Sequence, residues 1–152
     1  MRFSSQMNLA LDQARLAAGA DEVPVGAVIV SADGEVLAVA GNRTRRDHDP
    51  TAHAEILAIR QAALALGQER LEGCSLYVTL EPCAMCAGAL VHARLARVIY
   101  GASDPKSGGT AHGARVFSHP QAHHVPEVIS GICEEDCVEM LKVFFGKKRL
   151  NR

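Results

Sequence analysis

Apolar residues fall in two patterns along this chain: some recur three or four positions apart, and others form short continuous runs. The recurrence early in the chain is that of one helix face, and Gly19 follows it as a plausible stop. Thr51 and Gly67 are placed to cap and to end a second helix, and Pro82 is placed to start a third. Helices are therefore predicted over residues 5–18, 53–66, 83–93 and 133–145.

The continuous apolar runs, bounded by turn residues, predict buried strands. Asp33-Gly34 marks a tight turn between the first two runs, so these form a hairpin. Residues 101–124 are rich in Gly, Ser, His and Pro, and a loop of that length in a compact domain is usually functional. The predicted strands are residues 25–30, 36–40, 75–80, 98–100 and 125–130.

The elements therefore follow the order helix, hairpin, helix, strand, helix, strand, loop, strand, helix. Strands that alternate with helices predict an α/β fold of three layers, α/β/α. We expect a five-stranded mixed sheet, largely parallel, with an antiparallel N-terminal hairpin at one edge and helices on both faces. At 152 residues, length alone favours a single domain over residues 1–152.

Composition mainly excludes classes of protein. An apolar fraction of 48% and a charged fraction of 22% exclude disordered and fibrous chains. No apolar run approaches the ~20 residues of a membrane span, and the first residues lack a signal-peptide core. We therefore expect a cytoplasmic protein with no membrane partner.

Charge leaves nucleic-acid binding open. The net charge of −1 gives no bulk support for it, because phosphate contact needs many Lys and Arg side chains. Basic residues nevertheless gather in two places, one before the second helix and one near the end of the chain. Each cluster is either a solvated surface or part of a local rim that binds a small RNA. Their members include Arg43, Arg45, Arg46, Lys147, Lys148 and Arg149.

Two short fragments carry candidate chemistry, His53-Ala54-Glu55 and Pro82-Cys83-Ala84-Met85-Cys86. One histidine and two cysteines supply three ligands for a tetrahedral zinc ion, and an open fourth position distinguishes a catalytic zinc site from a structural one. Cys83 and Cys86 would share a face in the first turn of a helix, where the helix dipole favours the thiolate that binds zinc. His53 would open the other helix and meet them.

Glu55 lies two residues beyond His53 and is better placed as a proton carrier than as a fourth ligand. The alternative is a structural zinc site completed by a fourth side chain, for which His48 or Cys74 is nearest in sequence. The three remaining cysteines are otherwise interpreted as small buried hydrophobic residues or as thiols on a helix face, and they are Cys74, Cys133 and Cys137.

With these residues in view, the sequence resembles the zinc-dependent nucleobase deaminases, whose signature is H-x-E followed by P-C-x-x-C. Longer stretches resemble the bacterial tRNA-specific adenosine deaminases of the cytidine-deaminase superfamily. These stretches are Val23–Val28, Asn42-Arg43, Asp49–Glu55, Leu76–Gly88 and Gly101–Lys106. The resemblance implies a cytidine-deaminase-like fold and hydrolytic deamination of the wobble adenosine in a tRNA anticodon stem-loop. It also implies one Zn²⁺ per subunit and a homodimer whose RNA site spans both subunits.

The resemblance further implies residue roles. Asn42 would hydrogen-bond the flipped base, and Asp104 and Lys106 would touch the flanking nucleotides. The backbone N–H groups of Ala54 and Cys83 would face the reacting group. The other implied positions are Glu81 and Pro82 in the pocket wall and Arg43, Arg45, Lys147, Lys148 and Arg149 on the RNA backbone.

Other readings stay open. The main enzymatic alternative is a guanine deaminase, because that family shares the D-P-T-A-H-A-E run. The small residues 87–89 and the run Asp104-Pro105-Lys106 favour RNA as the substrate instead. A cytidine or cytosine deaminase fits less well. A zinc-stabilised RNA-binding module without chemistry would have no need of Glu55. The loop after Lys106 is rich in histidine. These histidines are either exposed polar residues of the loop or ligands of a second, weak metal site, and they are His112, His119, His123 and His124.

Overall fold

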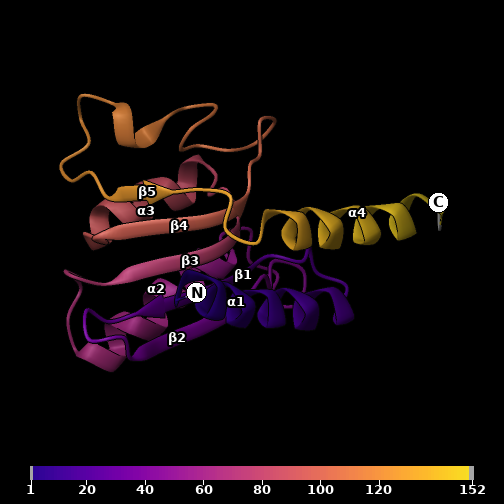
Figure 1. Ribbon diagram of the computed structural model, residues 1–152, viewed down its shortest axis with the longest axis horizontal. Helices are drawn as coiled ribbons and strands as arrows, with labels where there is room; N and C mark the ends of the chain where they lie inside the picture. Colours follow the sequence, from indigo (N-terminus) through magenta and orange to yellow (C-terminus); the bar gives the residue numbers. More distant parts are fainter. Residues whose placement is uncertain (1, 151–152) are drawn as a thin grey trace.

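The computed structural model describes residues 2–150, and within them the helices and strands follow the predicted order. Figure 1 shows the chain from indigo at the N-terminus to yellow at the C-terminus. The elements are α1 (Arg2–Gly19), β1 (Gly26–Val30), β2 (Val36–Gly41), α2 (Ala54–Leu66), β3 (Ser75–Leu80), α3 (Ala84–Ala93), β4 (Arg97–Ala102), the short 3-10 helix η1 (Val116–Ser118), β5 (Glu127–Ile129) and α4 (Glu134–Leu150).

The five strands form one mixed sheet in the order β2-β1-β3-β4-β5. β3, β4 and β5 run parallel, whereas β1 is antiparallel to both β2 and β3. The β1–β2 pairing confirms the predicted antiparallel hairpin, and the expectation of parallel strands elsewhere is wrong for one pairing, that of β1 with β3. The reason is that the hairpin joins the sheet through its first strand, which places β2 at the edge and forces β1 against β3 in the opposite direction.

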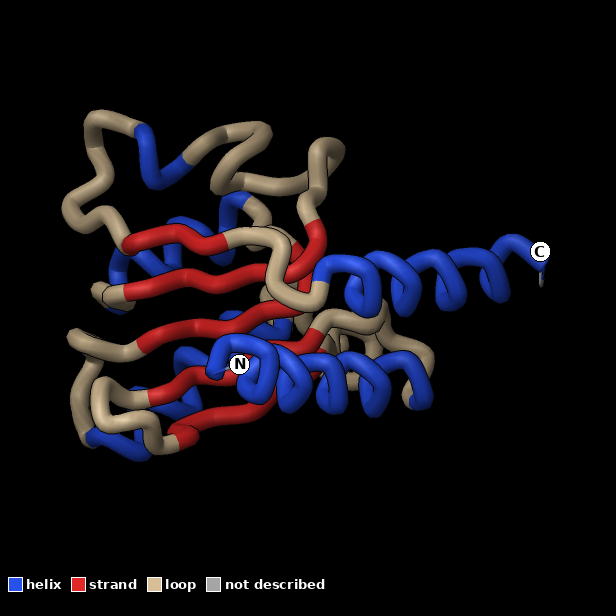
Figure 2. Tube along the Cα trace, viewed as in Figure 1, coloured by secondary structure: helices blue, strands red, loops and turns tan. Residues whose placement is uncertain are grey.

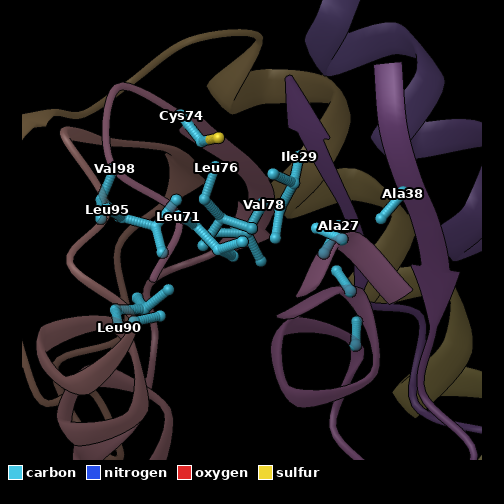
Figure 3. Close-up of a cluster of buried hydrophobic side chains, with 14 of the residues drawn as sticks. Ala27, Ile29, Ala38, Leu71, Cys74, Leu76, Val78, Leu90, Leu95 and Val98 are labelled. Atoms are coloured by element: carbon cyan, nitrogen blue, oxygen red, sulfur yellow. The ribbon is translucent and has the colours of Figure 1, made fainter. Parts of the chain in front are cut away.

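Helices cover both faces of the sheet, as predicted (Figure 1). Alternate strand residues point to opposite faces, so Ala27 and Ile29 of β1 pack towards α2 and α3, while Val28 and Val30 pack towards α1 and α4. Figure 3 shows the first of these two cores, which is built from aliphatic side chains such as Leu76 and Val78 together with Leu90 of α3.

The helix ends refine the sequence prediction at the two positions that matter for the site. The N-cap of α2 is His53, not Thr51, and the N-cap of α3 is Cys83; neither makes a side-chain capping hydrogen bond. Gly67 ends α2 in the left-handed conformation, as its lack of a side chain allows. α4 runs beyond the predicted Phe145 to Leu150 and extends past the ends of the strands (Figure 2).

The topology brings four chain connections to the same end of the strands: the one that enters β1 and those that leave β2, β3 and β4. β2, β3 and β4 point the same way, and β1 points the opposite way, so the start of β1 lies beside the ends of the other three. The connections that lead from β2 into α2 and from β3 into α3 therefore begin at this end of the sheet. The carboxyl ends of strands are where α/β sheets bind ligands, so a site is expected here.

None of the helices within residues 2–150 is both long enough and apolar enough to cross a lipid bilayer.

Candidate active site

Three potential metal ligands meet where α2 and α3 begin. The ligand atoms of His53, Cys83 and Cys86 lie within 4.8 Å of one another, and His53 Nδ1 is 3.6 Å from Cys83 Sγ and 3.4 Å from Cys86 Sγ. A tetrahedral zinc ion with bonds of about 2.0–2.1 Å to nitrogen and about 2.3 Å to sulfur separates these atoms by roughly 3.5 Å. The donor set and its spacing therefore fit a zinc ion.

The two thiols differ in their protonation. The pKa of Cys83 falls to about 4, because the Cys86 thiol donates a hydrogen bond to it and the His53 ring and the backbone N–H of Cys86 add to this effect against the cost of burial. The same interaction, together with burial, raises the pKa of Cys86. The pair thus holds a ready thiolate at the helix N-terminus, which is the form that binds a metal.

The structure gives no fourth ligand to this group among residues 2–150, where the group of candidate ligands ends with these three. Cys74, one alternative, is buried in the hydrophobic core, where burial raises its pKa. His48, the other, is exposed on the loop before α2. An incomplete coordination sphere is what a catalytic metal requires.

Glu55 is the buried acid of the site, with 4% of its surface exposed. Burial raises its pKa to about 7, although the positive charge of His53 and a hydrogen bond from Cys86 act in the opposite direction. A carboxyl group with a pKa near neutrality can both accept and release a proton at physiological pH. Glu55 is thus suited to carry protons beside the metal ligands.

A pocket of about 270 Å³ opens onto these residues. This volume is close to the lower end of small-molecule pockets, roughly 300 Å³, and suits one planar ring system rather than a length of nucleic acid. Every connection at this end of the sheet contributes to its wall. It is lined by Val23, Val25, Asn42, Thr44, His53, Glu55, Leu80, Glu81, Cys83, Asp104 and Ser107.

Asn42 lies in the pocket wall with its amide held in one orientation. Its Oδ1 accepts a hydrogen bond from the backbone N–H of Ala54 at 3.0 Å, which leaves the NH₂ group for the pocket. The Ala54 N–H, which was expected to face the reacting group, donates to Asn42 in this structure, and any contact of that N–H with the reacting group stays a prediction. Ala54 contributes to the site through Asn42.

Glu22, which sequence analysis did not identify, holds the loop that carries Asn42. Its buried carboxylate accepts hydrogen bonds from the backbone N–H groups of Arg45 at 3.1 Å and Arg46 at 2.8 Å, and from Arg46 Nε at 3.2 Å. Arg46 in turn donates to the carbonyl of Asn42 at 2.9 Å. Burial opposes the charge, but these donors outweigh it and lower the pKa of Glu22.

We expect Glu22→Gln to lower the free energy of unfolding at pH 7 by about 1–3 kcal/mol, since an amide cannot match three donors and leaves part of the network unsatisfied. The lowered pKa means that ionised Glu22 stabilises the fold above its ordinary pKa of 4.5 and loses this effect as the pH falls below it. The difference between wild type and variant should therefore shrink in urea titrations below about pH 4.5. Glu69→Gln, at an exposed position, is the matched control and should change little at any pH.

Of the remaining predicted pocket residues, Glu81 and Asp104 line the pocket, and Lys106 lies exposed on the same loop. Pro82 is buried, and its carbonyl accepts a hydrogen bond from the N–H of Gly109 at 2.7 Å. It therefore supports the loop over the start of α3 instead of forming the wall. The lining residues Val23, Val25, Thr44, Leu80 and Ser107 were not predicted. Their only signal in the sequence is that each lies within three positions of a predicted site residue or in a stretch that carries the family resemblance.

The basic residues predicted for RNA are already partly paired. Arg43 forms an ion pair with Asp47, and Arg45 forms one with Asp21 at 2.8 Å. Lys148 of α4 reaches the same Asp21, so the two basic clusters, far apart in sequence, meet at one aspartate. Lys147 and Arg149 lie exposed on α4. Contact of any of these residues with RNA stays a prediction.

The histidines of the loop do not gather into a second metal site among residues 2–150. His112 contacts Glu81, His119 Nδ1 accepts the N–H of Gln121 at 3.1 Å, and His124 Nε2 lies 2.6 Å from the carbonyl of Leu95. Each therefore has its own local role in holding the loop.

Comparisons with known proteins identify the family of this chain. The model of the MafB19-like deaminase family matches residues 2–149. The tRNA-specific adenosine deaminase of Agrobacterium fabrum is 57% identical over 145 residues, which cover 95% of each chain. The protein of the same description from Bacillus subtilis is 46% identical over 143 residues, covering 94% of this chain and 88% of that one.

Solved structures extend the comparison. One from a study of A-to-I editing by tRNA:A34 deaminases is 57% identical, with a TM-score of 0.88 over 90% of this chain and 99% of that one. The guanine deaminase of Bacillus subtilis is 34% identical, with a TM-score of 0.65 over 80% and 81%. The predicted deaminase fold is confirmed by the first of these, and the identity over nearly the whole chain places this protein in the family of tRNA-specific adenosine deaminases, within the MafB19-like deaminases.

Proposed function

We propose that this chain is a zinc-dependent hydrolase that converts adenosine to inosine at the wobble position of a tRNA anticodon loop and releases ammonia. The observation that carries this proposal is the group His53, Cys83 and Cys86 beside buried Glu55, in a chain 57% identical to a tRNA-specific adenosine deaminase. A metal site, a proton carrier and a pocket for one base are the parts that hydrolytic deamination of a flipped nucleotide needs.

His53, Cys83 and Cys86 would hold one Zn²⁺ per subunit. Imidazole and thiolate ligands favour zinc over magnesium or calcium, which prefer oxygen. When bound, zinc acts as a Lewis acid and lowers the pKa of its water ligand to about 7. The chain's own residues supply the rest of the chemistry.

Glu55 would carry the protons. The net reaction adds water across the C6–N1 bond of adenine and then breaks the bond between C6 and the exocyclic amine. One proton must therefore reach N1, and another must reach the amine that leaves as ammonia. With a pKa raised to about 7 by burial, Glu55 can take a proton from water and return it to the substrate in turn.

Asn42 would read the base. Its Oδ1 is fixed by the Ala54 N–H, so its NH₂ group can donate to an acceptor on the edge of the purine. A base must leave its stack to enter a pocket of this size, and a single-stranded loop makes this inexpensive because unstacking is partly done. Asp104 and Lys106, on the loop after β4, would meet the flanking nucleotides.

The RNA backbone would lie along the two basic clusters, which meet at Asp21. Arg45 and Lys148 would exchange this exposed carboxylate for phosphate, and Lys147, Arg149 and Arg43 would add to the rim. Ion pairs between exposed side chains contribute little to stability, so this exchange costs little. We also place the enzyme in the cytoplasm, as a homodimer in which both subunits contact the RNA.

The second candidate substrate is guanine, since the guanine deaminase of Bacillus subtilis shares the fold at 34% identity. The higher identity and TM-score of the tRNA deaminase comparison favour RNA. Ammonia release should be measured side by side on an anticodon stem-loop with adenosine at the wobble position, on guanine, on cytidine and on free adenosine.

We expect the stem-loop to be the fastest substrate at equal concentration, because only it engages the basic rim as well as the base pocket. The same stem-loop with guanosine at the wobble position is the matched control and should release no ammonia. Faster release from free guanine than from the adenosine stem-loop would overturn the proposal.

A further inference from the structure

The loop that follows β4 is folded around one buried carboxylate, that of Glu81. Its Oε2 accepts the backbone N–H groups of Thr110 at 3.3 Å, Ala111 at 3.1 Å and His112 at 3.1 Å. Its Oε1 accepts the N–H of Asp104 at 3.1 Å and lies 2.7 Å from Nδ1 of the His112 ring. The start of the loop at Asp104 and its segment Thr110–His112 are thus fixed to the same side chain.

The glycines of this loop allow its backbone to pack directly against Glu81 and the start of α3. A Cβ on Gly108 would lie 2.4 Å from Glu81 Oε2, and a Cβ on Gly109 would lie 2.4 Å from the backbone nitrogen of Ala84 at the start of α3. Gly113, just after His112, has a φ of +58°, which a residue without a side chain adopts readily. The sequence of the loop is therefore fitted to the Glu81 carboxylate.

His112 supplies the contact that depends on residue type. Backbone N–H groups are available from almost any residue, but the bond to Oε1 comes from an imidazole whose side chain is 35% exposed, against 0% for Glu81. A carboxylate only accepts hydrogen bonds, so His112 Nδ1 must carry the proton and donate it. This is the short, charge-assisted kind of hydrogen bond.

Asp104 shares that carboxylate oxygen, and it connects His112 to the pocket. Asp104 Oδ1 accepts the N–H of Ser107 at 3.0 Å, and its carbonyl accepts the N–H of Gly108 at 2.8 Å. Asp104, Ser107 and Glu81 all line the pocket. The position of this wall is therefore set by the oxygen that His112 holds.

We infer that His112 is a positioning residue that, through Glu81 Oε1, fixes the Asp104 wall of the pocket and thereby controls how well the RNA loop is seated. The inference rests on the proposed function, because it concerns the same pocket. His112 touches neither Glu55 nor the metal ligands in its described contacts, so it acts on substrate binding and leaves the chemical step unchanged.

The test compares His112→Leu with His112→Asn on the wobble-adenosine stem-loop. Leucine removes the donor, whereas the Asn side-chain NH₂ can take the place of Nδ1–H. We expect His112→Leu to raise KM roughly tenfold, the worth of a charge-assisted hydrogen bond, with kcat and zinc content unchanged. His112→Asn should restore most of the loss. His123→Leu, an exposed histidine on the same loop, is the matched control and should leave KM unchanged.

Hydrogen exchange of the Asp104 and Thr110–His112 amides gives a second readout that needs no substrate. These amides should exchange faster in His112→Leu than in the wild type and recover in His112→Asn. Unchanged KM and unchanged exchange in His112→Leu would overturn the inference, and so would a loss of kcat or zinc with KM intact. If the wild type itself leaves the stem-loop unmodified, the proposed function fails, and amide exchange alone decides on the positioning role.

Discussion

Glu55→Gln is expected to bind one zinc ion per chain, to fold as the wild type does, and to deaminate the stem-loop about 10²–10⁴-fold more slowly. Glutamine keeps the shape and the hydrogen-bonding capacity of the buried side chain but cannot accept and return a proton. The loss should fall on kcat, because Asn42 and the pocket wall still bind the base. Single-turnover ammonia release measures the rate, mass spectrometry measures the zinc content, and the thermal midpoint measures the stability of the fold.

Glu55→Ala tests the same role without a polar side chain and should be as slow as the glutamine variant. Glu72→Gln, at an exposed position, is the control for loss of a carboxylate as such. Full activity in either Glu55 variant, with stoichiometric zinc bound, would refute the role of Glu55 as proton carrier. Loss of zinc from both would instead show that Glu55 helps to hold the metal.

Local sequence was sufficient to predict His53, Cys83 and Cys86 as candidate metal ligands, and the structure brings the three side chains together. His53 and Cys83 each follow a connection from a strand into a helix, and Cys86 lies one turn beyond Cys83, so the motif spacing already places all three in first turns of helices. Element order was predictable for the same reason, since periodicity and turn residues are local signals. Helix caps were less predictable: Thr51 is the better capping residue by type, but its hydroxyl donates to Asp49, and His53 is the N-cap of α2.

What sequence could not predict depends on contacts between distant segments. Glu22 and Arg46 are separated in sequence, and nothing local says that their ion pair holds the carbonyl of Asn42. The same holds for Glu81, which was predicted as pocket wall but also organises a loop around 30 residues downstream. Strand pairing belongs to this class too, because hairpin residues do not specify which of the two strands joins the sheet.

Cys86→Ala should abolish zinc binding and, with it, all measurable deamination. Cys86 is fully buried, the described residues offer no further candidate ligand in this group, and two remaining ligands are too few for a stable site. The chain offers a matched control in Cys74→Ala, which removes a thiol of similar burial from the hydrophobic core, away from the metal group. That variant should lose about 1 kcal/mol of stability through the lost packing and keep its zinc and its activity.

The comparison of the two cysteine variants separates a metal role from a packing role, because each variant deletes one buried sulfur atom and only Cys86 belongs to the metal group. Zinc content and ammonia release should be lost together in Cys86→Ala and retained together in Cys74→Ala. Addition of excess zinc should not restore Cys86→Ala, since the missing thiolate is a ligand and cannot be replaced by mass action at ordinary concentrations. Retention of stoichiometric zinc and turnover by Cys86→Ala would mean that Cys86 is not a required ligand, and its assignment to the metal would then be wrong.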